Sequence, residues 1–364
     1  MPAFLERMMG LAPHTVHQET GRYMSIPFQT ILLSGGTGSL GQALTRFLLS
    51  LSSTVAIRIL SRGEHRQADM DTALQSDQVR YLIGDVRDYE RVLLACHGVD
   101  LVIHAAALKR QPTLEYNPYE GVQTNVLGTY NVLRACAEAG VARCITVSSD
   151  KAVLPVTLYG HTKAIAESLA IRANMYRPGS FRSCVVRWGN VAGSQGSVIR
   201  IWQEALRRGE LLTITDATAT RFWVAMQEAV DAVWDAAQQE TAGVLYVPHS
   251  PAFMVQDLAV AMIRREFKLH SMHAEIALSV HTKDIGRRPA EKLHEVLLTD
   301  DEQARAVWSA GGACYLVPPV VRSWQETVDL GTFPAATFAT AYRSDVWPYR
   351  LTTEMLAHRL DGLL

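Results

Sequence analysis

The stretch from Thr30 to Gly41 reads Thr-Ile-Leu-Leu-Ser-Gly-Gly-Thr-Gly-Ser-Leu-Gly, and it decides the fold of the first half of the chain. Its first five residues form the short apolar run that is typical of a buried parallel strand. Glycines at 35, 38 and 41 let the backbone approach a pyrophosphate and let the helix expected at 42–51 pack close to the strand. Such a pattern alone is weak evidence, because tight turns explain most of them. The strand before it and the helix after it favour a dinucleotide-binding site.

Further apolar runs suited to buried strands follow at residues 55–60, 79–83, 100–104, 144–147 and 181–187. Helical stretches at 89–96 and 122–139 alternate with them, which is the rhythm of βαβ units in a doubly wound parallel sheet. Right-handed crossovers place all the strand ends on one edge of such a sheet. We therefore predict an α/β fold with a Rossmann-type parallel sheet and a smaller, sequence-discontinuous C-terminal substrate lobe.

Three segments follow from this pattern. We expect an N-terminal extension of unknown role at 1–26, a dinucleotide-binding core at 27–190, and a mainly substrate-binding lobe at 191–364. Part of the last segment, about 224–250, should return to the core, and an amphipathic helix from Thr352 should close the lobe or contact another subunit.

Composition excludes several classes of function. The 35 basic and 36 acidic residues nearly cancel, so no overall field attracts nucleic acid or an anionic membrane. No apolar run reaches the ~18 residues of a membrane span. The five cysteines are isolated, which is typical of core residues in a reducing cytoplasm rather than of a disulfide or zinc framework. His270 and His273 lack partner ligands, so no metal site is expected.

The residues after the second strand bear on the choice of dinucleotide. NAD-selective sites usually carry an acid about 20 residues past the glycines, where it binds the ribose 2′-hydroxyl. This chain has Ser61 and Arg62 there, and an arginine suits a 2′-phosphate through charge-assisted hydrogen bonds. We therefore favour NADP over NAD, the alternative being that Arg62 is an ordinary surface residue. Asp85, after the third strand, is expected to accept from the adenine amino group.

A candidate catalytic cluster follows the fifth strand. Tyr159 and Lys163 are four residues apart and share one face of a helix, although a bare Tyr-x-x-x-Lys often means only a solvated face. Ser149, Asp150 and Lys151 come just upstream, where a parallel sheet presents catalytic groups. A lysine ammonium beside the tyrosine favours the phenolate, which makes proton abstraction from a sugar hydroxyl feasible.

With these residues assembled, the chain resembles the extended short-chain dehydrogenase/reductase family, and within it the inverting UDP-N-acetylglucosamine 4,6-dehydratases of deoxysugar pathways. The resemblance covers roughly 29–300, and the matching segments are 34–39, 84–88, 104–109, 149–152, 158–160, 189–191, 220–223 and 291–295. The Asp150-Lys151 pair is the most specific, because retaining 4,6-dehydratases carry Asp-Glu there and 4-epimerases usually carry neither pair. The family usually has threonine at Ser149, arginine at Gln195 and glycine at Ala290.

The strand ends and the resemblance together imply two sets of binding residues. The cofactor set is Gly35, Thr37, Gly38, Ser39, Leu40, Gly41, Ser61, Arg62, Asp85, Val86, Ala105, Ala106, Ala107, Lys109, Asn125, Tyr159 and Lys163. The substrate set is Lys109, Asn190, Gln195, Ser197, Arg221, Arg288 and Glu291, with Arg187 and Lys292 as further cations for a nucleotide diphosphate.

The resemblance also implies a mechanism. Tyr159 removes the C4 hydroxyl proton of UDP-N-acetylglucosamine while hydride leaves C4, and Lys163 holds the cofactor ribose and lowers the pKa of the tyrosine. Lys151 then takes the C5 proton, Asp150 protonates the departing 6-hydroxyl, and Ser149 binds the C4 oxygen. Hydride returns to C6 and C5 is reprotonated on the opposite face, which gives UDP-2-acetamido-2,6-dideoxy-β-L-arabino-hex-4-ulose and water.

Alternatives remain for both the residue and the reaction. Lys151 would have a smaller role if it only paired with a phosphate or with Asp150. A UDP-sugar 4-epimerase or a retaining nucleotide-sugar 4,6-dehydratase would use the same fold. A non-catalytic NADP sensor would not need the catalytic cluster. The partners expected are a UDP-sugar and further copies of the chain, as a cytoplasmic dimer or hexamer, without nucleic acid or membrane.

Overall fold

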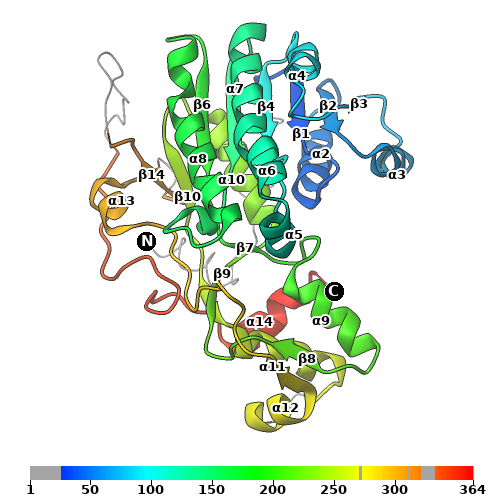
Figure 1. Cartoon of the computed structure of the whole chain (residues 1–364), viewed down its shortest axis with the longest axis vertical. Coiled ribbons are helices and arrows are strands. Elements are labelled where there is room, and N and C mark those ends of the chain that lie inside the picture. Colours follow the sequence, from blue (N-terminus) through cyan, green and yellow to red (C-terminus); the bar gives the residue numbers. More distant parts are fainter. Residues whose placement is uncertain (1–25, 270–272, 310–311, 321–332, 364) are drawn as a thin grey trace.

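A computed structural model describes residues 26–269, 273–309, 312–320 and 333–363. The N-terminal extension up to residue 25 and His270 lie outside the described residues. Within them, nine strands form one sheet in the order β13-β14-β10-β6-β5-β4-β1-β2-β3 (Figure 1).

The strands of this sheet are β1 (Thr30–Ser34), β2 (Ala56–Ser61), β3 (Val79–Ile83), β4 (Leu101–His104), β5 (Arg143–Val147), β6 (Arg182–Val186), β10 (Leu245–Pro248), β13 (Val307–Trp308) and β14 (Cys314–Val317). The pairs from β3 across to β10 are parallel, whereas β14 pairs antiparallel with both β10 and β13. The predicted doubly wound α/β fold is confirmed, and the six strands expected before residue 190 end within one residue of their predicted limits.

Helices cover both faces of the sheet. Those of the core are α2 (Ser39–Leu51), α3 (Glu64–Leu74), α4 (Tyr89–Cys96), α5 (Gln111–Tyr116), α6 (Pro118–Gly121), α7 (Gly128–Ala139), α8 (Leu158–Arg172) and α10 (Met226–Gln238). One apolar cluster packs α2 and α10 on one face through Leu44, Leu48 and Trp234, and another packs α4 and α7 on the other through Val92 and Val132. The helix expected at 122–139 begins as a π-helical segment, Val122–Leu127, which continues into α7.

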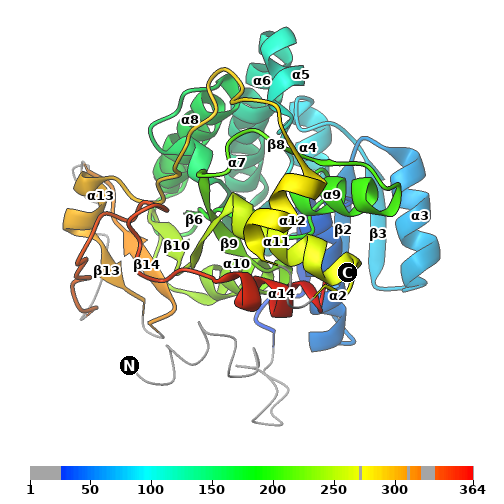
Figure 2. The same cartoon turned by 90° about the horizontal axis from the view of Figure 1, so that it is seen from below.

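A smaller lobe lies beyond the carboxyl ends of the parallel strands (Figures 1 and 2). Its elements are β7 (Asn190–Val191), α9 (Val198–Arg207), β8 (Leu212–Ile214), β9 (Thr220–Val224), β11 (Ala252–Met254), α11 (Val255–Glu266), α12 (Ala274–His281), β12 (Thr282–Asp284) and α14 (Thr353–Leu360). Helix α13 (Asp300–Arg305) instead lies beside β14 at the edge of the large sheet (Figure 1). Helices α9, α11 and α14 share an apolar core of their own, to which Trp202, Ile263 and Leu356 contribute. Thr352 caps α14 as the expected C-terminal helix. The domain limits themselves stay a prediction.

Three further predictions concern the cysteines, membrane spans and metal sites. All five cysteines are buried and free, which confirms that they are core residues. None of the helices in the described residues is long and apolar enough to cross a lipid bilayer. Among the same residues, no group of three His, Cys, Asp or Glu side chains is arranged to hold a metal ion.

Candidate active site

The turn between β1 and α2 is built on contacts that only glycine allows. Gly35 has φ +72°, and a Cβ atom there would lie 2.7 Å from the backbone nitrogen of Ala106. A Cβ atom on Gly41 would lie 2.4 Å from Gly36. No side chain caps α2 at Gly38, so the N–H groups of its first turn remain available to a bound anion. The turn therefore has the shape and polarity of a pyrophosphate cradle.

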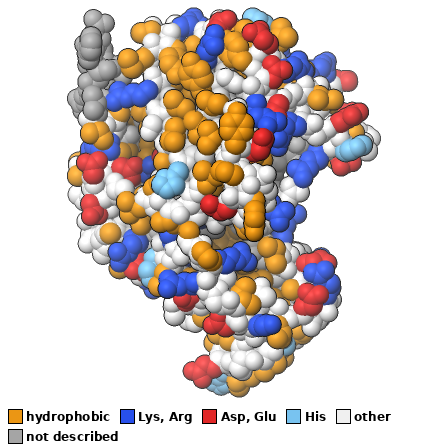
Figure 3. Space-filling view, viewed as in Figure 1, with side chains coloured by type: hydrophobic (Ala, Val, Ile, Leu, Met, Phe, Trp, Pro, Cys, Tyr) orange, Lys and Arg blue, Asp and Glu red, His pale blue; other side chains and the backbone are white. Residues whose placement is uncertain are grey.

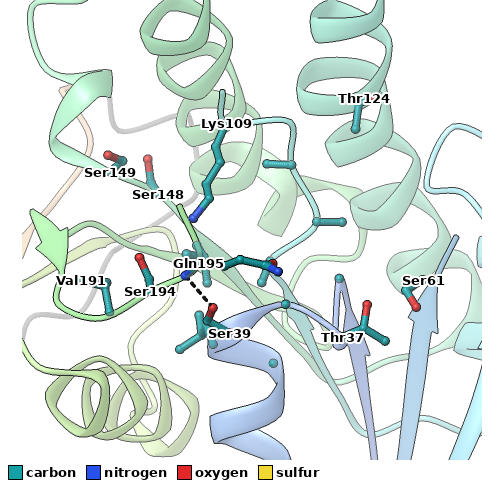
Figure 4. A pocket seen from close by; sticks show the side chains of 18 of the residues that line it. Thr37, Ser39, Ser61, Lys109, Thr124, Ser148, Ser149, Val191, Ser194 and Gln195 are labelled. Carbon is teal, nitrogen blue, oxygen red and sulfur yellow. Dashed lines mark hydrogen bonds between the residues drawn. The ribbon is translucent and has the colours of Figure 1, made fainter. Parts of the chain in front are cut away.

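A cavity of about 750 Å³ opens over this turn and along the carboxyl ends of the strands (Figure 4). Most of the expected cofactor residues line it, namely Gly35, Thr37, Gly38, Ser39, Leu40, Gly41, Ser61, Arg62, Asp85, Val86, Ala105, Ala106, Ala107, Lys109, Tyr159 and Lys163. Lys109 points into the cavity, and Gln195 lies across it, with its backbone N–H donating to Ser39 Oγ at 3.0 Å. Gln195, expected on the substrate, thus lies beside the cofactor turn.

Asn125 and Ser197, two of the expected binding residues, line neither this cavity nor the smaller one described below. The Asn125 amide accepts from Leu108 N at 2.8 Å and donates to Leu108 O at 2.9 Å, so it supports the cavity wall from behind. Ser197 precedes α9, and its buried hydroxyl has no hydrogen-bond partner in the described part of the chain. The assignments of Asn125 to the cofactor and of Ser197 to the substrate remain predictions.

Sequence reasoning missed several polar residues on the wall of the large cavity, among them two with buried hydroxyls and one cation. Ser148 and Thr124 line the cavity, and their hydroxyls are buried and have no hydrogen-bond partner among the described residues. Buried hydroxyls usually find a partner, so a bound ligand would satisfy them. Arg66 lines the cavity from the first turn of α3, beyond Arg62. A helix start directly after the second strand would have been the signal for it.

Charges at the β2 end of the cavity surround Asp85. Arg87 contacts Asp85 at 2.6 Å and Arg62 lies 3.8 Å from it, with the Arg62 side chain 53% exposed. Burial raises the pKa of the Asp85 carboxyl, but the hydrogen bonds and charge of Arg87 outweigh it and lower the pKa overall. Gln67 donates to Ser61 Oγ at 2.9 Å. This end therefore combines a hydroxyl and exposed guanidinium groups with a fixed carboxylate.

Helix α8 carries Tyr159 and Lys163 to the wall of the cavity. Thr157 caps the helix by accepting from Gly160 N at 3.2 Å. A Cβ atom on Gly160 would lie 2.4 Å from the carbonyl oxygen of Lys151, so glycine lets α8 pack directly on the 3-10 turn Asp150–Ala152. The five predicted catalytic residues are brought together by this contact.

The pKa of Tyr159 differs from our expectation. Burial raises it to about 12, although Lys151 and a hydrogen bond with Ser149 lower it. The ammonium of Lys163 donates instead to the carbonyl oxygen of Val147 at 2.5 Å, and burial lowers its pKa to about 8. The cation that favours the phenolate is therefore Lys151 rather than Lys163, because Lys163 is held by the strand end.

Asp150 and Lys151 form a buried ion pair. Lys151 Nζ lies 2.9 Å from Asp150 Oδ1 and 3.2 Å from Glu295 Oε1. Ser149 donates to the same Asp150 oxygen at 2.9 Å. Asp150 is 0% exposed and lines neither cavity, whereas Lys151 lines both.

Burial and the charges around this pair set its protonation state. Burial, with the nearby charge of Glu295, raises the pKa of Asp150. Burial lowers the pKa of Lys151, but Asp150 and Glu295 outweigh it and raise the pKa overall. Lys151 therefore rests as an ammonium.

A second cavity of about 190 Å³ adjoins the first and shares Lys151, Asn190 and Gln111 with it. Arg221 and Arg288 line it, as does Glu291, whose carboxylate accepts from Arg221 at 3.3 Å and from Thr215 at 2.8 Å. Three of the expected substrate residues therefore gather with Asn190 beside the catalytic pair.

Arg187, expected as a substrate cation, has a structural role. It is buried, and it contacts Glu167 at 2.6 Å and Glu302 at 2.9 Å. A third contact is the carbonyl oxygen of Leu297. These bonds tie α8 to α13 and to the segment before it, so Arg187 is a salt-bridged residue and not a cation for the substrate. Lys292, by contrast, lines the small cavity and donates to Val153 O at 2.5 Å.

The fold and the site together are those of the nucleotide-sugar dehydratases and epimerases. The chain belongs to the polysaccharide biosynthesis protein family, which it matches over residues 31–310. It is 40% identical over 276 residues, 75% of this chain and 78% of the relative, to an inverting UDP-N-acetylglucosamine 4,6-dehydratase of Campylobacter jejuni. It is 42% identical over 282 residues, 76% of this chain and 80% of the relative, to a UDP-glucose 4-epimerase of Rickettsia conorii. Among solved structures, Pen from Bacillus thuringiensis is similar with a TM-score of 0.82 and 30% identity, over 93% of this chain and 98% of Pen.

Proposed function

We propose that the chain is a UDP-N-acetylglucosamine 4,6-dehydratase that inverts C5. The observation that carries this proposal is the Asp150–Lys151 ion pair at 2.9 Å, with its amine on the wall of both cavities and Tyr159 beside it. Elimination of water needs a base for C5 and an acid for the C6 oxygen, and an adjacent amine and carboxyl supply both. The Campylobacter relative, named as an inverting dehydratase, supports the same assignment.

The large cavity suits a nicotinamide dinucleotide. The glycine cradle at Gly35 and Gly41 has no room for a side chain. Ser148 and Thr124 line the cavity, and their hydroxyls have no partner among the described residues. When bound, such a cofactor would accept hydride from C4 of the sugar and return it to C6, so that the reaction has no net redox change. We propose NADP rather than NAD, since Arg62 and Arg66 both line the β2 end of the cavity.

Proton movements fall to side chains of this chain. Tyr159 acts as its phenolate, the form that Lys151 and Ser149 favour, and takes the proton of the C4 hydroxyl as C4 is oxidised. The resulting 4-ketone acidifies C5. Lys151 rests as an ammonium, so it first passes one proton to Asp150 across their 2.9 Å contact. The neutral amine then takes the C5 proton, the C6–O bond breaks, and the proton of Asp150 leaves with the hydroxyl as water.

The position of Asp150 constrains the last step. Its carboxyl is fully buried and Oδ2 has no hydrogen-bond partner within the described ranges. The proton must therefore reach the C6 oxygen through Lys151 or Ser149, both of which contact Asp150 Oδ1 and line the large cavity. A proton from solvent then completes C5 on the opposite face, Tyr159 releases the C4 proton to solvent, and the product is the 4-keto-6-deoxy-L-sugar.

Mass spectrometry of products from a panel of UDP-hexoses tests this proposal. UDP-N-acetylglucosamine should lose one water, and absorbance at 340 nm should show no lasting gain because the cofactor is recycled. An early NMR spectrum in D₂O should show the L-arabino 4-ketone deuterated at C5. A D-xylo ketone as the first product would instead indicate a retaining enzyme.

A UDP-sugar 4-epimerase is the second candidate, and the Rickettsia relative supports it. An epimerase needs Tyr159 but no acid and base for C5 and C6, so the buried Asp150–Lys151 pair favours the dehydratase. The product separates the two, because an epimer has the mass of the substrate.

We also propose that the chain forms a homo-oligomer. Large hydrophobic side chains are exposed on α6, α7, α8 and the 3-10 turn Ala173–Tyr176, and Figure 3 shows hydrophobic atoms gathered over this side of the molecule. Tyr130 and Tyr176 contact each other edge to face, with Ile165 also exposed on α8. A contiguous apolar surface of this kind is typical of a protein interface.

A further inference from the structure

Glu295 lies on the substrate-lobe side of the site but reaches the catalytic pair of the core. Its backbone is held at two points by Ser344, whose Oγ accepts from Glu295 N and whose N donates to Glu295 O, both at 2.9 Å. A bridge between the neighbouring His294 and Thr220 ties the same segment to β9. The carboxylate is therefore presented to the core from a fixed backbone.

The side chain of Glu295 is almost completely buried, at 4% exposed, yet it makes few hydrogen bonds. Oε1 lies 3.2 Å from Lys151 Nζ, on the ammonium that Asp150 also contacts. Glu295 lines the small cavity, and its buried Oε2 has no hydrogen-bond partner in the part of the chain that the structure describes. Arg221, at 4.0 Å, and Lys292, at 3.9 Å, are its other charged neighbours.

These contacts place the Lys151 ammonium between two carboxylates that come from opposite sides of the site. Asp150 and the Tyr159 phenol face it from the core, and Glu295 faces it from the lobe, with Arg221 and Lys292 behind. A buried charge is tolerated when it is paired, so each carboxylate stabilises the ammonium. When one of these two carboxylates receives the proton of Lys151, the other still accepts a hydrogen bond from the neutral amine.

We propose that Glu295 is a positioning residue for the water-loss step, which holds the Lys151 amine at the junction of the two cavities and sets how readily it gives its proton to Asp150. This inference rests on the proposed function. When the proton moves from Lys151 to Asp150, Glu295 still accepts a hydrogen bond from the neutral amine and keeps it facing the cavity. Glu295 takes no part in the oxidation at C4, which Tyr159 serves.

The variant Glu295→Gln separates positioning from a purely structural ion pair. It removes one negative charge 3.2 Å from the ammonium, so Lys151 loses its proton more easily. The pH at which water loss is half-maximal should fall by roughly 1–3 units, and kcat at the optimum should fall about ten- to a hundredfold as the amine loses a charged hydrogen bond. Reduced cofactor should accumulate at 340 nm in a single turnover, because C4 oxidation outruns elimination.

Glu291→Gln is the matched control. It removes a carboxylate from the same segment and the same cavity, but that carboxylate contacts Arg221 and not Lys151. We expect Glu291→Gln to raise KM and to leave the pH of half-maximal water loss as in the wild type. Glu295→Asp keeps the charge but shortens the side chain. The pH of half-maximal water loss should therefore return to the wild-type value, while kcat stays low.

These experiments test the positioning role of Glu295 separately from the proposed dehydratase activity. A wild type that releases no water overturns both. The proposed role of Glu295 alone is overturned if the wild type releases water and a folded Glu295→Gln variant behaves like it. Such a variant would keep the wild-type pH of half-maximal water loss and would accumulate no reduced cofactor. If Glu295→Gln does not fold, Glu295→Asp decides, since an unchanged kcat in that variant contradicts a positioning role.

Discussion

At the scale of single residues, Lys151 is the side chain on which the proposed chemistry most depends. Lys151→Met should still oxidise C4, trapping reduced cofactor at 340 nm, while water loss falls below detection. Lys151 is also the cation that lowers the pKa of Tyr159. Its removal raises that pKa further, so the pH at which C4 oxidation is half-maximal should move upward. Water loss at the wild-type rate would show that Lys151 is only an ion-pair partner.

The pair of arginines at the β2 end of the large cavity makes a second prediction at this scale. Arg62→Ala and Arg66→Ala should each weaken NADP more than NAD, because the proposed partner, the 2′-phosphate, exists only on NADP. A charged hydrogen bond contributes about 1.5–3 kcal/mol, which corresponds to roughly ten- to a hundredfold in Kd. Titration of both dinucleotides by fluorescence or calorimetry measures it. Equal losses for the two cofactors would contradict a role in reading the phosphate.

At the scale of elements, the contact between α8 and the turn after β5 makes the third prediction. In Gly160→Ala the new methyl group would meet the Lys151 carbonyl at 2.4 Å, so α8 must shift and carry Tyr159 with it. We expect a kcat loss of tenfold or more and a destabilisation of about 1–3 kcal/mol by urea unfolding. Gly362→Ala is the control, because a Cβ atom there meets nothing within 4 Å. Full activity in Gly160→Ala would argue against this close packing.

Local elements were predictable, and elements that depend on distant partners were not. The strand β1 and the helix α2 follow from neighbouring residues, because an apolar run and glycine spacing are local signals. Helix α3 escaped notice since only Gln67 and Met70 are buried in it, and so Arg66 escaped with it. Strand β14 joins the sheet only by pairing with β10, a partner about 70 residues away, which no local pattern reveals.

In the candidate site, too, local features could be predicted from the sequence and tertiary contacts could not. The chemical types of Ser149, Asp150 and Lys151 were readable from the sequence, because they directly follow a buried strand. Their position relative to the cavity could not be predicted from the sequence. Tertiary packing buries Asp150 behind the cavity wall and places Lys151 on that wall. Glu295 comes from a segment about 145 residues away along the chain, and only the structure brings its carboxylate to Lys151.

At the scale of the whole molecule, the exposed apolar face on α7 and α8 makes the last prediction. Ile165→Asp places a charge on this face, where the native side chain is 49% exposed. If this face is the interface, the variant should be monomeric by light scattering while the wild type is a dimer or larger. Leu211→Asp is the control, because Leu211 is similarly exposed, at 48%, but lies on the other lobe. An Ile165→Asp variant that keeps the wild-type mass would exclude this face as the interface.

The late return of the chain to its own sheet has a consequence for how the protein is made. Strand β10 pairs with β6 along one edge and with β14 (Cys314–Val317) along the other. On a ribosome, that edge stays open while the roughly 65 residues between the two strands are synthesised. An open strand edge is a template for pairing with another chain, and larger proteins aggregate through such transient edges. Expression of this protein should therefore depend on chaperones during that interval, and truncation before β13 should leave a chain that aggregates, even though every residue of the catalytic cluster has already been translated.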